Sequence, residues 1–135
     1  MRILGWRRGC FVVGLAGCLL LTSCGGYVAR GRHLYAEGRY IESAELLARH
    51  ERELADEPPR RQAEYATYRG LSNLVIGNYP EAQRWMTYAY EIVGRYPGAL
   101  RPDFRMELDQ GWYELTSHLG PKPVKPRPDA QAVVP

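Results

Sequence analysis

Thiol chemistry in this chain of 135 residues is confined to its N-terminal segment. The three cysteines are Cys10, Cys18 and Cys24. The rest of the chain therefore has no thiol that could form a disulfide, bind a metal ion or act as a nucleophile. An oxidising compartment is compatible with this distribution but is not required by it. Any chemistry at cysteine must take place at or before Cys24.

The other side chains that could support catalysis or metal binding are scattered. His33, His50 and His118 lie far apart, and none belongs to a ligand-spaced motif such as H-E-x-x-H. The four serines lack the surroundings of a nucleophile elbow. Acidic residues between positions 51 and 57 alternate with arginines, which is typical of a solvated helix with i, i+4 pairs. We expect no catalytic residue, no metal site and no enzyme activity.

The segment from Met1 to Leu21 has the plan of a secretory signal peptide. Arg2, Arg7 and Arg8 form a positive stretch, and an uncharged run of small and apolar residues extends from Cys10 to Leu21. A permanent span needs about 20 apolar residues, so this run is short for one, although an uncleaved anchor is the alternative. The Arg7-Arg8 pair makes twin-arginine export an alternative, but the residues on either side of the pair match that signal poorly. Ordinary secretory export is expected.

The end of this run is similar to the lipobox of bacterial lipoproteins, in which small residues precede a cysteine that is diacylated before cleavage. The matching residues are Leu21-Thr22-Ser23-Cys24, although Leu15-Ala16-Gly17-Cys18 fits the pattern more closely. Cleavage before Cys18 would leave a very short apolar core and a mature start of Cys-Leu-Leu-Leu. Cleavage before Cys24 follows a longer core and precedes Gly25-Gly26. We therefore predict a signal peptide at 1–23 and a covalent lipid on Cys24, with no other cofactor.

The lipobox resemblance implies a lipid-anchored protein of the bacterial cell envelope. Several acyl chains would anchor it stably, since each buried methylene contributes about 0.8 kcal/mol. Glycine rather than aspartate after Cys24 favours, by resemblance to enterobacterial sorting, the periplasmic face of the outer membrane. Removing the three leader arginines from the 18 basic residues leaves 15 against 15 acidic ones. A formally neutral protein is not expected to bind nucleic acid.

A sequence repeat follows the leader. In the first copy, Gly31 is followed by Gly38-Arg39-Tyr40. In the second copy, Gly70 is followed at the same spacing by Gly77-Asn78-Tyr79. We call the separation between Gly31 and Gly70 the repeat offset. An acidic residue and a small residue follow each tyrosine, with Ser43-Ala44 in the first copy and Ala82 in the second. The second copy resembles tetratricopeptide repeats, in which small residues let two antiparallel helices touch. The residues that this resemblance implies for packing are Gly31, Gly38, Tyr40, Gly70, Gly77, Tyr79 and Ala82.

The chain between 24 and 119 reads as one all-α domain. Gly and Pro separate segments of helical periodicity, and the alternation typical of strands is scarce. The resemblance implies about two helix-turn-helix pairs followed by a capping helix. We expect helices over Val28–Glu37, Tyr40–Asp56, Arg60–Ile76, Pro80–Arg95 and Pro102–His118.

The repeat resemblance also implies a concave groove, lined by the first helix of each pair, that binds a peptide or a partner helix. A clamp for a terminal carboxylate is not expected, because the lysine and asparagine used for it in the family are absent. Leu71 and Leu74 could instead pack between the repeats. The matching groove positions are Val28, Arg32, Tyr35, Thr67, Leu71 and Leu74.

Residues 120–135 form a proline-rich tail that is expected to be extended. Polyproline II structure rises about 3.1 Å per residue. Lys122, Lys125 and Arg127 against Asp129 give the tail a charge of +2. The tail is either a spacer or a basic tether that contacts an anionic envelope polymer or a proline-binding partner.

Two functions are consistent with these features. The first is a membrane-anchored adaptor that holds a protein partner of the cell envelope through its repeat surface. The second is a structural envelope component that self-associates through its exposed repeat ends while the tail contacts the cell wall. Resemblance to a repeat family does not identify the partner.

Overall fold

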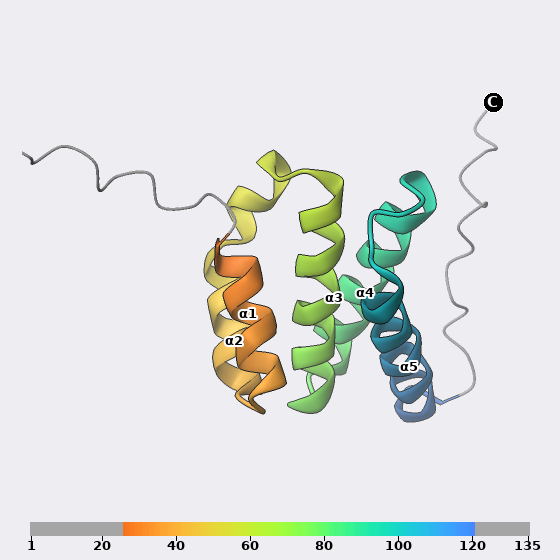
Figure 1. The fold of residues 1–135 in the computed structure, drawn as a ribbon. Helices are drawn as coiled ribbons and strands as arrows, with labels where there is room; N and C mark the ends of the chain where they lie inside the picture. Colours follow the sequence, from red (N-terminus) through yellow and green to blue (C-terminus); the bar gives the residue numbers. More distant parts are fainter. Residues whose placement is uncertain (1–25, 121–135) are drawn as a thin grey trace, which may run out of the picture.

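The computed structural model describes residues 26–120 and consists there of helices without strands, which confirms the all-α class. The predicted signal peptide, Cys24 and the tail beyond Gly120 lie outside the described residues. The described residues form five α-helices and one 3₁₀ helix, and the α-helices are labelled in Figure 1. In chain order they are α1 (Gly26–Ala36), α2 (Tyr40–Arg49), η1 (Glu51–Asp56), α3 (Pro59–Val75), α4 (Tyr79–Arg95) and α5 (Pro102–His118).

Two equivalent turns connect α1 with α2 and α3 with α4. Gly38 has φ +77° and Gly77 has φ +80°, the left-handed conformation that glycine adopts without strain. The following amides reach back across each helix end: Arg39 N–H donates to the Leu34 carbonyl, and Asn78 N–H to the Asn73 carbonyl, both at 2.9 Å. This is the Schellman arrangement, which satisfies carbonyls left open at a helix end.

The region between α2 and α3 differs from the predicted single helix over Tyr40–Asp56. The α-helix ends at Arg49, and the tighter η1 follows. His50 stacks on Tyr27 with ring centroids 4.4 Å apart and planes inclined by 8°. In η1, Leu54 is buried in the core. The burial of Leu54 coincides with the change from α-helical to 3₁₀ winding. Local helix propensity does not predict this change, because it depends on a contact with the core.

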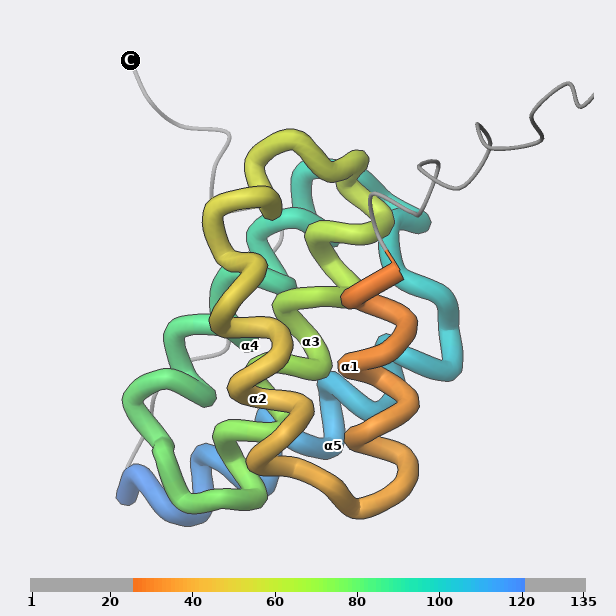
Figure 2. Tube along the Cα trace, turned by 90° about the vertical axis from the view of Figure 1, so that its left-hand side faces the viewer, coloured from red at the N-terminus to blue at the C-terminus, as the bar shows by residue number. Residues whose placement is uncertain are grey.

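The helices lie in two layers around α3. Viewed along the row of helices, α2 and α4 lie on one side and α1 on the other, and α5 runs obliquely from the α1 side toward the lower end of α4 (Figure 2). The central helix α3 contacts each of the other four α-helices. Eleven of its residues, from Ala63 to Leu74, are accordingly buried. The protein core is therefore organised around one helix, with α5 closing its far side (Figure 1).

Glycines allow the close helix contacts. A Cβ at Gly31 would lie 2.7 Å from Leu47 Cδ2, and a Cβ at Gly70 would lie 2.7 Å from Met86 Cγ. Leu47 and Met86 are themselves separated by the repeat offset, so the two helix pairs share the same close contact. A third approach occurs at Gly111, whose Cβ would lie 2.3 Å from Leu71 Cδ2. The absence of a side chain at Gly111 therefore lets α5 pack closely against α3.

Candidate protein-interaction surface

The predicted groove residues divide into two groups in the structure. Val28, Thr67, Leu71 and Leu74 are all at most 5% exposed and belong to the core rather than to a surface. Thr67 satisfies its hydroxyl internally by donating to the Ala63 carbonyl at 2.8 Å. Leu71 packs against α5 at Gly111, and Leu74 belongs to the same buried core cluster. Four of the six predicted positions are therefore packed in the core, where the packing alternative places Leu71 and Leu74.

The remaining two positions, Arg32 and Tyr35, line a shallow cavity of about 470 Å³. We name this surface the α1–α3–α5 face, because each of these helices contributes to it. It combines aromatic side chains with charges of both signs. Its residues are Arg32, His33, Tyr35, Ala36, Tyr68, Phe104 and Glu107.

A row of aromatic rings forms the floor of the α1–α3–α5 face. Tyr35 meets Tyr68 edge-on with centroids 5.5 Å apart, and Tyr68 meets Phe104 in the same way at 5.5 Å. Tyr40 adds a fourth ring 5.2 Å from Tyr35. Edge-to-face pairs of this kind are worth about 0.5–1.5 kcal/mol beyond their buried area. The row gives the face an apolar base, and its four rings come from α2, α1, α3 and α5.

Cationic groups flank this aromatic row. Arg32 Nη1 lies 2.9 Å from Glu64 Oε1, while its guanidinium carbon is 5.2 Å from the centre of the Phe104 ring. The guanidinium carbon of Arg101 is 4.7 Å from the same ring. The Arg32 side chain is 37% exposed, so it remains accessible to a partner. The face can therefore contact an apolar side chain and an adjacent polar or acidic group together.

The two tyrosines of the face are held in the neutral form. Burial raises the pKa of Tyr35, with a further contribution from the negative charge of Glu107. Burial raises the pKa of Tyr68 as well, again helped by Glu107. Both phenols therefore remain hydrogen-bond donors across the physiological pH range. No acid–base role follows from these shifts.

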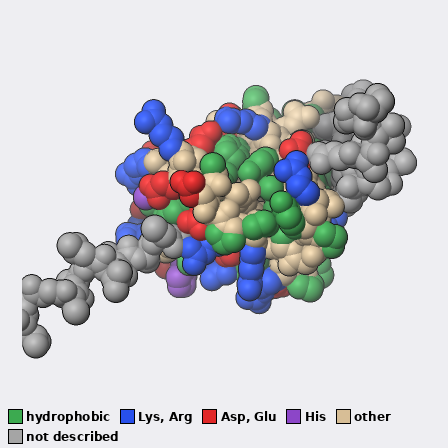
Figure 3. Space-filling model, turned by 90° about the horizontal axis from the view of Figure 1, so that it is seen from above, with side chains coloured by type: hydrophobic (Ala, Val, Ile, Leu, Met, Phe, Trp, Pro, Cys, Tyr) green, Lys and Arg blue, Asp and Glu red, His purple; other side chains and the backbone are tan. Residues whose placement is uncertain are grey.

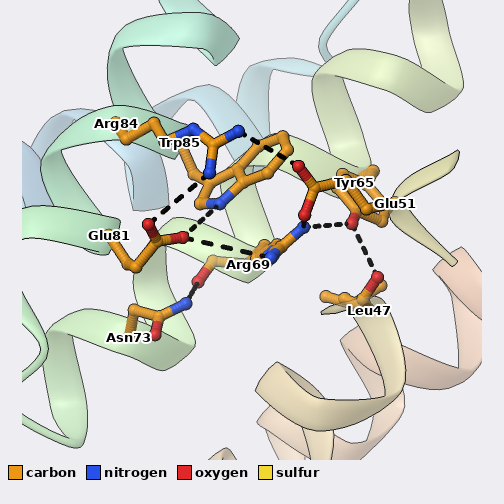
Figure 4. A network of polar contacts seen from close by, with 8 residues as sticks. All are labelled: Leu47, Glu51, Tyr65, Arg69, Asn73, Glu81, Arg84 and Trp85. Carbon is orange, nitrogen blue, oxygen red and sulfur yellow. Dashed lines mark hydrogen bonds and ion pairs between the residues drawn. The ribbon is translucent and has the colours of Figure 1, made fainter. Parts of the chain in front are cut away.

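A buried arginine network lies on the other side of α3 (Figure 4). Arg69 is 6% exposed, and its Nη1 donates to Glu51 Oε2 at 2.8 Å and to the Tyr65 hydroxyl at 2.6 Å. Tyr65 in turn donates to the Leu47 carbonyl at 2.6 Å. The Arg69 guanidinium also lies 4.1 Å from the centre of the Trp85 ring. The network joins α2, η1, α3 and α4.

Glu51 is the carboxylate shared by this network. Its two oxygens accept from Arg69 and from Arg84, 2.8 and 3.0 Å away. Burial acts to raise the pKa of Glu51, but the two arginines outweigh it, and the pKa lies below its ordinary value. Burial raises the pKa of Tyr65 to about 12 despite the positive charge of Arg69. The acidic cluster was expected to form only i, i+4 pairs, yet Glu51 bridges to residues 18 and 33 positions away.

Several residues of these sites were not selected from the sequence. Tyr68 lies in the second repeat, and Phe104 and Glu107 lie in the predicted capping helix. None of the three was predicted as a groove residue, but all three line the α1–α3–α5 face. Arg69 is four residues from both Tyr65 and Asn73, and all three are buried. This helical spacing was the available signal that Arg69 lies on an inner stripe.

The end of the molecule that carries η1 and the α4–α5 loop has a mixed surface. Acidic side chains and arginines are interspersed there around exposed hydrophobic side chains (Figure 3). No group of three or more His, Cys, Asp or Glu side chains within residues 26–120 is arranged to hold a metal ion. Over the same residues, none of the helices is both long enough and apolar enough to cross a membrane.

Comparisons with known proteins find no relative for this chain. No protein-family model, curated protein or solved structure matches it.

Proposed function

We propose that this chain is a lipid-anchored protein of the bacterial envelope whose helical body is a tetratricopeptide-like adaptor. The adaptor presents the α1–α3–α5 face to a partner protein. The observation that carries this proposal is the cavity on that face. Its walls come from α1, α3 and α5 and contain the aromatic row and the accessible Arg32. Aromatic residues and arginine are enriched where proteins bind one another.

The equivalence of the two helix pairs supports the tetratricopeptide-like arrangement. The turn glycines, the close-contact glycines and the residues that these contact all recur at the repeat offset. Helix α3 contacts α1 as well as α2, and α5 contacts α3 as well as α4. Stacked helix pairs of solenoid proteins have this pattern, in which each unit contacts only its neighbours.

The lipid anchor is tested by two matched cysteine substitutions. Cys24→Ser is expected to abolish incorporation of labelled palmitate and to release the protein from the membrane fraction, because the acceptor thiol is lost. Cys18→Ser is the control and is expected to leave both properties intact. The measurement is metabolic labelling followed by membrane fractionation. The reverse pattern would assign the lipid to Cys18.

The adaptor role is tested by photo-crosslinking in intact cells. A photoreactive amino acid at Tyr35 is expected to capture the same foreign protein repeatedly, because Tyr35 lines the α1–α3–α5 face. Adding Arg32→Glu is expected to reduce that product at least about tenfold, since a desolvated charge contact contributes more than about 1.4 kcal/mol. The matched control places the photoreactive group at Tyr113, which is 79% exposed on α5 and lies off the face. Self-crosslinks alone at Tyr35 would contradict the proposal.

A self-associating structural component is the second candidate, and one feature of α5 favours it. Met106 is 70% exposed and Tyr113 is 79% exposed. They are seven residues apart and therefore lie on the same side of the helix. As the last helix of the row, α5 has no following helix within residues 26–120 to cover this side. Crosslinks between two copies through Tyr113, with none to another protein from Tyr35, would favour this candidate.

A further inference from the structure

A second depression lies in the other layer, between η1 and the outer side of α4. It has a volume of about 670 Å³, and we call it the α4–η1 groove. Ala55, Pro80 and Tyr88 supply apolar walls, and Glu51 and Glu91 supply carboxylates. The one arginine that lines it, Arg84, is held by Glu51 at 3.0 Å and by Glu81 at 3.5 Å (Figure 4). Glu51 is itself paired with Arg69 and Arg84 but stays 38% exposed, so the groove offers apolar contacts together with the Glu91 carboxylate and the exposed part of Glu51.

One end of this groove lies where the described chain ends. His118, the last residue of α5, stacks on Tyr79 with ring centroids 4.7 Å apart, and its Nδ1 lies 3.3 Å from the Tyr79 hydroxyl. Pro80, the next residue, lines the groove. From Pro80 the groove extends along α4 to Glu91, a distance of about 17 Å at 1.5 Å per helical residue. Chain that continues past Gly120 thus starts beside the groove.

The segment that follows has the length and the chemistry to fill the groove. Residues 121–128 read Pro-Lys-Pro-Val-Lys-Pro-Arg-Pro and would extend about 25 Å in a polyproline II conformation. With three residues per turn, Lys122 and Lys125 share one edge of such a helix, and Pro123 and Pro126 share another. One edge is therefore cationic and a second is apolar, which matches the carboxylates and the apolar walls.

We propose that Pro121–Pro128 of the same chain docks along the α4–η1 groove. Pro123 and Pro126 pack against Ala55 and Tyr88, as proline-rich segments pack on aromatic surfaces elsewhere. Lys122 faces Glu51, which lies nearer the Pro80 end of the groove, and Lys125 faces Glu91 at its far end. Because the segment is tethered at Gly120, its effective concentration at the groove is in the millimolar range, and weak contacts suffice to hold it.

Disulfide trapping tests this docking, using the full chain in mild detergent with Cys10, Cys18 and Cys24 replaced by serine. One variant carries Val124→Cys with Thr87→Cys, which lines the groove. The control carries Val124→Cys with Gln110→Cys, exposed on α5. Thr87 is eight residues from Tyr79, and Gln110 is eight residues from His118, so both positions lie about 12 Å from the stacked pair. Both variants must retain the circular dichroism spectrum of the parent.

Under a mild oxidant, the Thr87 pair is expected to form an intrachain disulfide at least about tenfold faster than the Gln110 pair, because docking raises the local concentration of residue 124. Adding Lys122→Glu and Lys125→Glu is expected to bring the two rates together. Equal rates in the parent pairs would overturn the proposal. A preference for disulfides between two chains would also overturn it, by assigning the groove to a second copy.

Discussion

Replacing Arg69 with leucine is expected to lower the free energy of unfolding by about 3 kcal/mol, the lower end of the range of about 3–5 kcal/mol for breaking a buried ion pair. The substitution removes the donor to Glu51 and Tyr65 and the cation beside Trp85. The loss is moderated because Glu51 is 38% exposed and retains Arg84. Urea denaturation followed by circular dichroism measures the change.

Arg84→Leu is the matched control for this prediction. Arg69 Nη2 also lies 3.9 Å from Glu81 Oε2, so both arginines pair with Glu51 and Glu81, but the Arg84 side chain is 57% exposed. Exposed ion pairs contribute about 0–1 kcal/mol, so the Arg84 variant should unfold nearly as the parent does. Arg69→Lys should fall between them, because lysine keeps the charge but loses the planar fork. Equal destabilisation at positions 69 and 84 would contradict a role for burial.

Replacing Gly70 with valine is expected to destabilise the protein by about 3 kcal/mol, at the upper end of typical overpacking costs. A Cβ at this position would lie 2.7 Å from Met86 Cγ and 3.2 Å from the Met86 backbone nitrogen. Moving a side chain cannot relieve the second contact, so α4 must shift away from α3. These are the two helices with the most extensive contact in the structure. Thermal and urea denaturation both report this change.

Gly31→Val is the control, since the nearest atoms to a Cβ there all belong to the Leu47 side chain. Shortening that side chain with Leu47→Ala should recover part of the stability lost in Gly31→Val. Met86→Ala should recover a smaller fraction of the loss in Gly70→Val, because it removes the contact with Met86 Cγ but leaves the contact with the Met86 backbone nitrogen. Equal rescue at both sites would show that the helices are spaced by side chains alone.

The two proposed interaction sites lie on different layers of the fold. The α1–α3–α5 face is built by the odd-numbered helices, whereas the α4–η1 groove lies between η1 and α4. Docking of the tail therefore leaves Tyr35 and Arg32 accessible. A partner and the tail could bind at the same time, so disrupting one contact need not disrupt the other.

Features that depend on near neighbours in the chain were predictable from the sequence alone. The all-α class follows from helical periodicity interrupted by glycine and proline. The repeat offset recurs in the structure at the turns of Gly38 and Gly77, both with positive φ. A helix end with a left-handed glycine is decided by a few consecutive residues, and hence it is visible in the sequence.

Features that depend on which helix covers which were decided only by the tertiary structure. Leu71 and Leu74 were equally suited to a groove and to a core, and the structure buries both, Leu71 against Gly111 of α5. Glu51 had local arginines available, yet it bonds Arg69 and Arg84 from two other helices. Local pairing energies on a helix surface are only about 0.2–0.5 kcal/mol, so the packing of distant elements overrides them. Burial of a charged or apolar side chain depends on how the helix layers pack together, and the local spacing of residues does not reveal it.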